Sequence, residues 1–172
     1  MVYRAVVLSC LLYGSEAWTL NAKQIRRLER FHQKCLRSIC RIKWYHKIPD
    51  FEILNRCRIF SVQSLLDKNN LRWTGHVIRM DETRIPKILL YGRVDEGAAR
   101  QGNHRTFLNS VKSLLREYRI DSLTLEEQAN NRNAWRSLVY HKTKKGHEDY
   151  ISDMKEWRCR RKAGVGPASV PA

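Results

Sequence analysis

Residues 61–80 read SVQSLLDKNNLRWTGHVIRM, and this stretch decides the fold. Its apolar residues recur three or four positions apart, or at multiples of that spacing, which is the period of one α-helical face. They are Val62, Leu65, Leu66, Trp73, Val77 and Met80. Another face carries Lys68, Arg72, His76 and Arg79. The stretch therefore predicts a helix that buries one face and offers cations to phosphate groups on another. For His76, a hydrogen bond to a neighbouring helix is an equally good interpretation.

A longer cationic pattern lies upstream, in a helix predicted from Ala22 to about Ile42 with Asn21 as its N-cap. The predicted core face of this helix consists of Ile25, Leu28, Phe31, Cys35, Ile39 and Ile42. The opposite side carries Lys23, Arg27, Arg30, Lys34, Arg37 and Arg41, at steps of three and four residues. Glu29 is the only acid nearby in the sequence, so the positive potential of this side is not cancelled.

A basic, aromatic turn follows, with Lys43, Trp44 and Lys47, and Pro49–Asp50 then opens a short helix to about Cys57. Tryptophans at helical spacing are more often core residues than base-stacking residues. Trp44 is the one tryptophan that we expect to stack on a base, because it lies in this basic turn beside Tyr45.

The whole chain is predicted to be all-α, with a small helical bundle at 1–82, a linker at 83–104, a second helical segment at 105–162 and a disordered tail at 163–172. An almost wholly apolar helix is expected over 2–13, ended by Gly14. Its exposed surface predicts self-association. In the second segment, Thr124 and Glu127 fit a capping box, and separate helices are predicted through Trp135 and over 150–162.

The overall charge indicates a polyanionic partner. The 172 residues include 33 Lys+Arg and 17 Asp+Glu, which gives a formal net charge of +16. Nucleic acid is favoured over a membrane surface because the cations recur on several helices. The alternative is a basic surface that binds no partner.

Five irregularly spaced cysteines predict reduced thiols in an intracellular protein. The apolar run 5–13 is too short to span a bilayer, and no clear cleavage site supports reading it as a secretory signal.

Four motifs resemble, in the same order, the region after the polymerase core of LINE-type, non-LTR retrotransposon reverse transcriptases. They are LLYGSEAWTL (11–20), RRLERFHQKCLRSI (26–39), LRWTGHVIRM (71–80) and NRNAWRSLV (131–139). The resemblance covers the chain short of its last residues. It implies that 1–82 corresponds to the thumb side of such an enzyme, and that the chain begins downstream of the catalytic palm of a longer ancestral polyprotein. It also implies that the basic helix lies against the backbone of template and primer.

Catalysis is not expected. Polymerase chemistry needs carboxylates that hold two metal ions, and the sequence has no Asp-Asp pair. Pro49–Asp50 and the distant Asp153-Met154-Lys155 match fragments of a nuclease motif, but on predicted helices, so chance explains them better. A zinc site at His32, Cys35, Cys40 and His46 lacks a Cys-x-x-Cys pair. We therefore expect no metal and no cofactor.

The sequence thus predicts a non-catalytic nucleic-acid-binding fragment that contacts RNA or DNA with weak sequence selectivity. Its expected contacts are Lys23, Arg27, Arg30, Lys34, Arg37, Arg41, Lys43, Trp44, Lys47, Arg72, His76 and Arg79. Two alternatives remain open at this point. One is a helical protein-interaction module that recruits a partner through its apolar first helix, and the other is a decayed transposon remnant without selected function.

Overall fold

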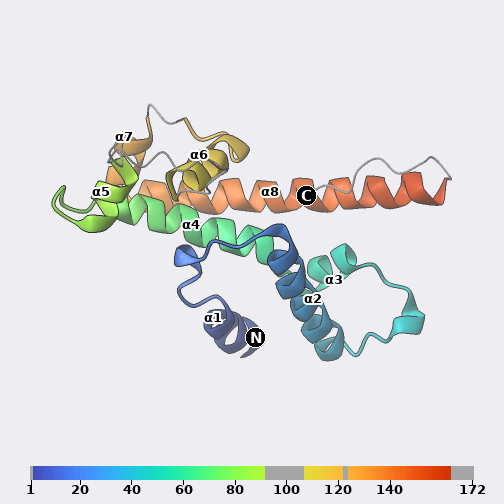
Figure 1. Cartoon of the computed structure of the whole chain (residues 1–172). Helices are drawn as coiled ribbons and strands as arrows, with labels where there is room; N and C mark the ends of the chain where they lie inside the picture. Colours follow the sequence, from blue (N-terminus) through green and yellow to red (C-terminus); the bar gives the residue numbers. More distant parts are fainter. Residues whose placement is uncertain (1, 92–106, 122–123, 164–172) are drawn as a thin grey trace, which may run out of the picture. The chain divides into compact units, whose positions relative to one another are not determined.

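The computed structural model describes residues 2–91, 107–121 and 124–163, and within these ranges all regular structure is helical (Figure 1). The prediction of an all-α fold is therefore confirmed. A π-helical segment, Tyr3–Val7, runs into the first α-helix. The α-helices are α1 (Leu8–Leu11), α2 (Ala22–Ile39), α3 (Asp50–Cys57), α4 (Val62–Ile78), α5 (Ile85–Tyr91), α6 (Phe107–Glu117), α7 (Leu125–Asn130) and α8 (Arg132–Lys162).

The chain forms two compact units, and each unit combines two separate stretches of sequence. Unit 1 comprises Met1–Thr19 with Leu66–Lys142, and unit 2 comprises Leu20–Leu65 with Thr143–Ala172. This grouping differs from the consecutive segments 1–82 and 105–162 that the sequence predicts. The predicted linker 83–104 includes helix α5, while its residues 92–104 and the predicted tail from 164 onward lie outside the described residues.

The core of unit 1 forms where α4, α6 and the first part of α8 pack together (Figure 1). Val77 of α4 is buried, as the sequence predicts. Val111, Leu114 and Leu115 of α6 are also buried, as is Tyr118, which follows the end of α6. Helix α4 also buries polar groups. Its Asp67 accepts a hydrogen bond from the Tyr118 hydroxyl at 2.8 Å. Burial raises the pKa of that tyrosine, and the neighbouring Asp67 raises it further.

Gly75 brings α4 and α8 into close approach. A Cβ atom at Gly75 would lie 2.1 Å from Nε1 of Trp135, which is closer than any real contact. The same indole N–H donates to the carbonyl of Leu71 on α4 at 3.0 Å. Trp135 is 2% exposed, so it is a core residue, as expected for a tryptophan at helical spacing.

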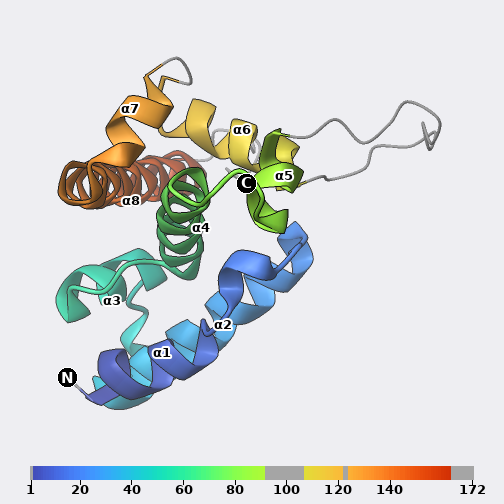
Figure 2. The same cartoon turned by 90° about the vertical axis from the view of Figure 1, so that its left-hand side faces the viewer.

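In unit 2, α2 packs beside α3 (Figures 1 and 2), but the predicted core face of α2 is correct only in part. Its half-buried members are Ile25, Leu28, Cys35 and Ile42. The buried residues of α2 are His32, Gln33 and Leu36. Phe31 and Ile39, which the apolar pattern placed in the core, are 45% and 58% exposed. The buried face is one that two polar side chains share, so the apolar pattern alone could not identify it.

Helices α2, α3 and α6 end in the same way, with an arginine in the left-handed conformation followed by an isoleucine. The arginines are Arg41, Arg58 and Arg119, with φ of 52°, 52° and 50°. In each case the isoleucine N–H donates to the carbonyl five residues earlier, at 2.8–3.1 Å, which is the Schellman pattern. The cationic side chain at the negative end of the helix dipole offsets part of the cost of a positive φ.

The other helix ends agree with the sequence in part. Asn21 caps α2 as predicted, and Gln24 completes a reciprocal capping box with it. The predicted box at Thr124 does not form, because its hydroxyl accepts a hydrogen bond from the Gln128 side chain instead of a backbone N–H. The two helices predicted around Trp135 and over 150–162 are one continuous helix, α8.

Two thiols meet at the junction of α2 and α3. Cys40 is the C-cap of α2 and Cys57 is the last residue of α3. Their Sγ atoms lie 3.2 Å apart, with both cysteines as free thiols. Burial, together with the hydrogen bond to Cys40, raises the pKa of the Cys57 thiol to about 11.

Candidate nucleic-acid interface

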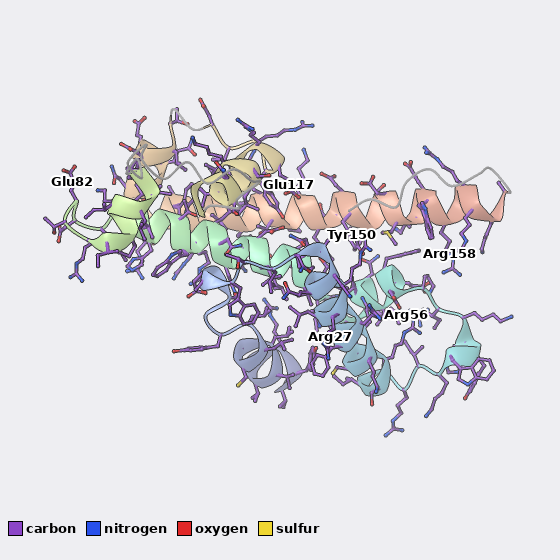
Figure 3. The ribbon with its side chains drawn as sticks, in the orientation of Figure 1. Arg27, Arg56, Glu82, Glu117, Tyr150 and Arg158 are labelled. Atoms are coloured by element: carbon purple, nitrogen blue, oxygen red, sulfur yellow. The ribbon has the colours of Figure 1, made fainter. Side chains whose placement is uncertain are left out.

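Four cations of α2 form an exposed row, which we call the α2 track: Lys23, Arg27, Arg30 and Lys34. Their spacing of four, three and four residues places them on one side of the helix. Figure 3 marks Arg27 on α2. Within the described part of the chain, no ion pair involves any of the four. The α2 track is therefore a row of cations without carboxylate partners.

Glu29, the acid that the sequence places nearest to the track, is engaged elsewhere. Its Oε2 accepts a hydrogen bond from the backbone N–H of Val62, at the start of α4, at 2.7 Å. Its Oε1 accepts one from the Gln33 side chain at 3.3 Å. Burial raises the pKa of Glu29, and the bond from Val62 opposes that shift. Glu29 therefore satisfies an unpaired N–H at a helix start instead of neutralising the track.

Arg37 is the one predicted member of the row that already has partners. Its guanidinium forms an ion pair with Asp50, the first residue of α3, and donates to the carbonyl of Ile48 at 2.8 Å. Its side chain is 28% exposed. Arg37 thus joins the turn before α3 to α2, and it is not available to phosphate in the way that the sequence predicts. Arg41 is exposed, but it lies in the turn after α2 instead of on the helix.

The predicted stacking residue lies in an open turn. Trp44 is 86% exposed and Tyr45 is 59% exposed, in a 3-10 turn held by a hydrogen bond from Lys43 N–H to Nδ1 of His46 at 3.0 Å. Lys43 and Lys47 are exposed on either side of this turn. Exposure of an aromatic ring between two lysines is what base stacking requires.

Trp44 and Lys47 also line a hollow of 750 Å³ within unit 2, together with residues from the C-terminal half of α8. Arg158 of α8, marked in Figure 3, donates to the carbonyl of Lys47 at 3.5 Å. The guanidinium of Arg161 lies 5.3 Å from the centre of the Trp157 ring. No sequence pattern indicated that α8 contributes cations and a second tryptophan beside the aromatic turn.

The remaining predicted contacts, Arg72, His76 and Arg79, line a separate pocket within unit 1. This pocket has a volume of 620 Å³, and we call it the arginine pocket. Arg132 and Arg136 at the start of α8 also line it, and neither was predicted from the sequence. Their spacing of four residues around Trp135 was the available signal. Three of the four motifs quoted above contribute to the lining: 11–20, 71–80 and 131–139.

Cations crowd one another in this part of unit 1. Burial lowers the pKa of Arg79, and the nearby Arg132 lowers it further. Burial also lowers the pKa of Lys68, as do Arg4 and Arg72. Arg79 donates to the carbonyl of Ala129, which holds its guanidinium in place. His76 stays exposed, and its ring lies 5.3 Å from that of Trp73 on the same helix.

The structure offers no support for the metal sites considered from the sequence. Among the residues described, no three His, Cys, Asp or Glu side chains are grouped so as to hold a metal ion. Asp50 is paired with Arg37 at the start of α3, and Asp153 is an exposed residue of α8.

None of the described helices combines the length and the apolar character that crossing a bilayer requires.

Comparisons with protein-family models, with curated proteins and with solved structures produced no match to this chain. The two basic surfaces just described are therefore the basis for inferring a function.

Proposed function

We propose that this chain is a non-catalytic nucleic-acid-binding protein that holds RNA or DNA by its phosphate backbone. The observation that carries this proposal is the α2 track, whose four exposed cations share one side of a helix without acidic partners. Exposed helical cations are commonly matched by acids three or four residues away, as Lys144 and Glu148 are on α8. An unmatched row attracts polyanions and gains free energy by releasing their counterions.

The arrangement favours binding without strong sequence selectivity. Lysine and arginine side chains on a helix surface reach phosphates, whereas selectivity requires contacts to base edges. Arg41 and the aromatic turn extend the basic surface beyond the end of α2. If the resemblance to LINE-type reverse transcriptases reflects a shared role, this surface would help hold template and primer beside a polymerase palm.

The test is the salt dependence of binding to a short duplex. If the track and Arg41 contact about five phosphates, a plot of log affinity against log salt should have a slope near −4 to −5. The triple variant Arg27→Gln, Arg30→Gln, Lys34→Gln should flatten that slope by about 2.7, because each lost phosphate contact contributes about 0.9. Fluorescence anisotropy of a labelled duplex at several salt concentrations measures both slopes.

A matched control separates the track from net charge. The triple variant Lys112→Gln, Arg116→Gln, Lys145→Gln removes the same charge from exposed positions of α6 and α8. It should change the slope by less than one. Equal flattening by both triple variants would mean that overall charge causes the effect, and it would contradict binding by the α2 track.

One observation favours a second candidate, a protein-interaction module. Val2 and Val6, at the start of the chain, are 74% and 53% exposed. The double variant Val2→Ser, Val6→Ser distinguishes the two functions without disturbing Leu8 and Leu12, which are buried. A nucleic-acid-binding protein should keep its duplex affinity in this variant, whereas an interaction module should lose its self-association or its partner, as measured by sedimentation.

A further inference from the structure

The arginine pocket is lined by two kinds of group, cations and aromatic rings. Its cations are Arg72 and Arg79 from α4 and Arg132 and Arg136 from α8. Its aromatic groups include Tyr13 and Trp73. Glu16 is the one carboxylate in the described lining. The pocket therefore offers a strong excess of positive charge beside aromatic rings.

The crowding of cations has a physical consequence. Guanidinium groups that face one hollow repel one another, and Arg79 is also partly withdrawn from water. An anion that enters the hollow relieves this repulsion and accepts several charge-assisted hydrogen bonds at once. Arginine suits phosphate best, since its planar group presents two parallel N–H donors.

The aromatic lining distinguishes a nucleotide from a simple anion. Tyr13 is 86% exposed, immediately before Gly14, whose φ of 66° turns the chain away from the first helix. An exposed ring at the side of an anion site provides a flat surface on which a base can stack. Inorganic phosphate would make no use of it.

The walls of the pocket are fixed by packing. Trp135, which lines it from α8, is held by its hydrogen bond to Leu71 and by its contact with Gly75. Asn69, on the α4 side, donates to the hydroxyl of Ser15 at 2.9 Å, which ties the segment after Tyr13 to α4. A volume of 620 Å³ lies within the usual range for small-molecule sites.

From these features we infer that the arginine pocket binds one unpaired nucleotide, with its phosphate held by Arg72, Arg132 and Arg136 and its base stacked on Tyr13. The site lies wholly within unit 1 and does not use the α2 track, which belongs to unit 2. Nucleotide binding by the arginine pocket can therefore be tested separately from backbone binding by the α2 track.

Calorimetric titration of the full chain at low salt with adenosine 5′-monophosphate, adenosine and inorganic phosphate tests the inference. The monophosphate should bind at least about tenfold more tightly than either part alone, because only the monophosphate uses both the arginines and the tyrosine. Equal affinity for inorganic phosphate would overturn the inference and leave a plain anion site. Failure of the monophosphate to bind would also overturn it.

Variants locate the ligand. The double variant Arg132→Gln, Arg136→Gln should weaken monophosphate binding at least about tenfold, and Arg72→Gln, on the opposite wall, should weaken it in the same direction. If both arginine variants lose affinity for the monophosphate, a local defect of α8 cannot be the cause, because Arg72 belongs to α4. Tyr13→Ala should weaken binding of the monophosphate by about tenfold and leave that of inorganic phosphate unchanged. The α2-track triple variant is the control, and should bind the monophosphate normally. Unchanged affinity in both arginine variants would exclude this pocket as the site.

Discussion

Gly75 is a residue whose lack of a side chain is required by the packing of unit 1. It has no side chain at the point where α4 meets the indole of Trp135, and the space that a Cβ atom would need is already filled. In a helix, alanine is normally preferred over glycine by about 1 kcal/mol. Glycine in the middle of α4 is therefore explained by the position of Trp135, and not by the helix propensity of glycine.

Gly75→Ala should lower the free energy of unfolding by about 1–3 kcal/mol, because the cost of overpacking exceeds the gain in helix propensity. Urea unfolding measures the change. The double variant Gly75→Ala, Trp135→Leu should then lose less than the sum of the two single variants, since the contact between the two residues is the cause. Additive losses would point to another origin of the destabilisation.

Single residues also explain where sequence-based prediction of helix ends fails. The prediction carried α2 on to about Ile42, because Arg41 and Ile42 continue both of its patterns. In the structure Arg41 adopts a positive φ and α2 ends at Ile39. Glycine is the usual signal for such an end, and arginine gives no such signal. The Arg-Ile pairs at 41–42, 58–59 and 119–120 are not a reliable cue either, because a fourth pair, at 84–85, stands where α5 begins.

At the scale of the helix, the sequence predicted the charged side of α2 better than its buried side. Charge spacing depends only on the helical period, and the α2 track is exposed as expected. Which apolar residues are buried depends on the elements that pack against the helix. His32, buried on α2, hydrogen-bonds to the backbone of Phe60, a contact between residues distant in sequence. No local pattern encodes it.

We expect the ion pair between Arg37 and Asp50 to stabilise the fold slightly and, at the same time, to keep Arg37 from binding phosphate. Asp50→Asn should lower the free energy of unfolding by less than about 1 kcal/mol, because both groups are partly exposed. It should also release Arg37 for phosphate and steepen the salt slope of duplex binding by about 0.9. Urea unfolding and anisotropy titrations measure the two changes in one variant.

Glu52→Gln provides the matched control for this prediction. It changes the net charge equally and releases Arg56, the partner of Glu52 within α3. Because Arg56 is not part of the α2 track, the slope should stay within a few tenths of the wild-type value. An equal increase in both variants would mean that net charge, and not the release of Arg37, sets the affinity.

At the scale of the whole molecule, acid should destabilise the folded chain above the range in which ordinary carboxylates titrate. Burial lowers the pKa of His32 from 6.5 to about 4, and burial also lowers that of His147. Each histidine is protonated less readily in the folded state than in the unfolded state. Stability should therefore fall as the pH drops from about 6.5 to 4, by about 3 kcal/mol for His32 alone. Glu29, whose pKa is raised, has the opposite sign and offsets part of this loss.

His32→Gln should flatten the dependence of stability on pH between 6.5 and 4, even if the variant is less stable throughout. Urea midpoints at closely spaced pH values give the slope. His141→Gln, at an exposed position of α8, should leave the slope as it is. A steep slope that survives His32→Gln would assign the acid sensitivity to other groups, with His147 the next to test.

The organisation of the chain into units was the part least accessible from sequence. A consecutive division at 83–104 follows from the glycines and proline there, which break the helical period. The structure instead groups the first residues with 66–142, and both α4 and α8 contribute to the two units. Such groupings arise from packing between distant segments, and periodicity carries no information about those contacts.

The neighbouring thiols of Cys40 and Cys57 bear on how any preparation is kept. In air, an oxidant could remove two hydrogens and join the sulfurs, closing a ring around 41–56 that carries the aromatic turn. The raised pKa of Cys57 keeps its thiolate scarce in neutral buffer, and alkaline storage increases the amount of that thiolate and so favours the reaction. An aged stock would then hold two covalent species, and a fresh reductant such as dithiothreitol keeps the protein as one.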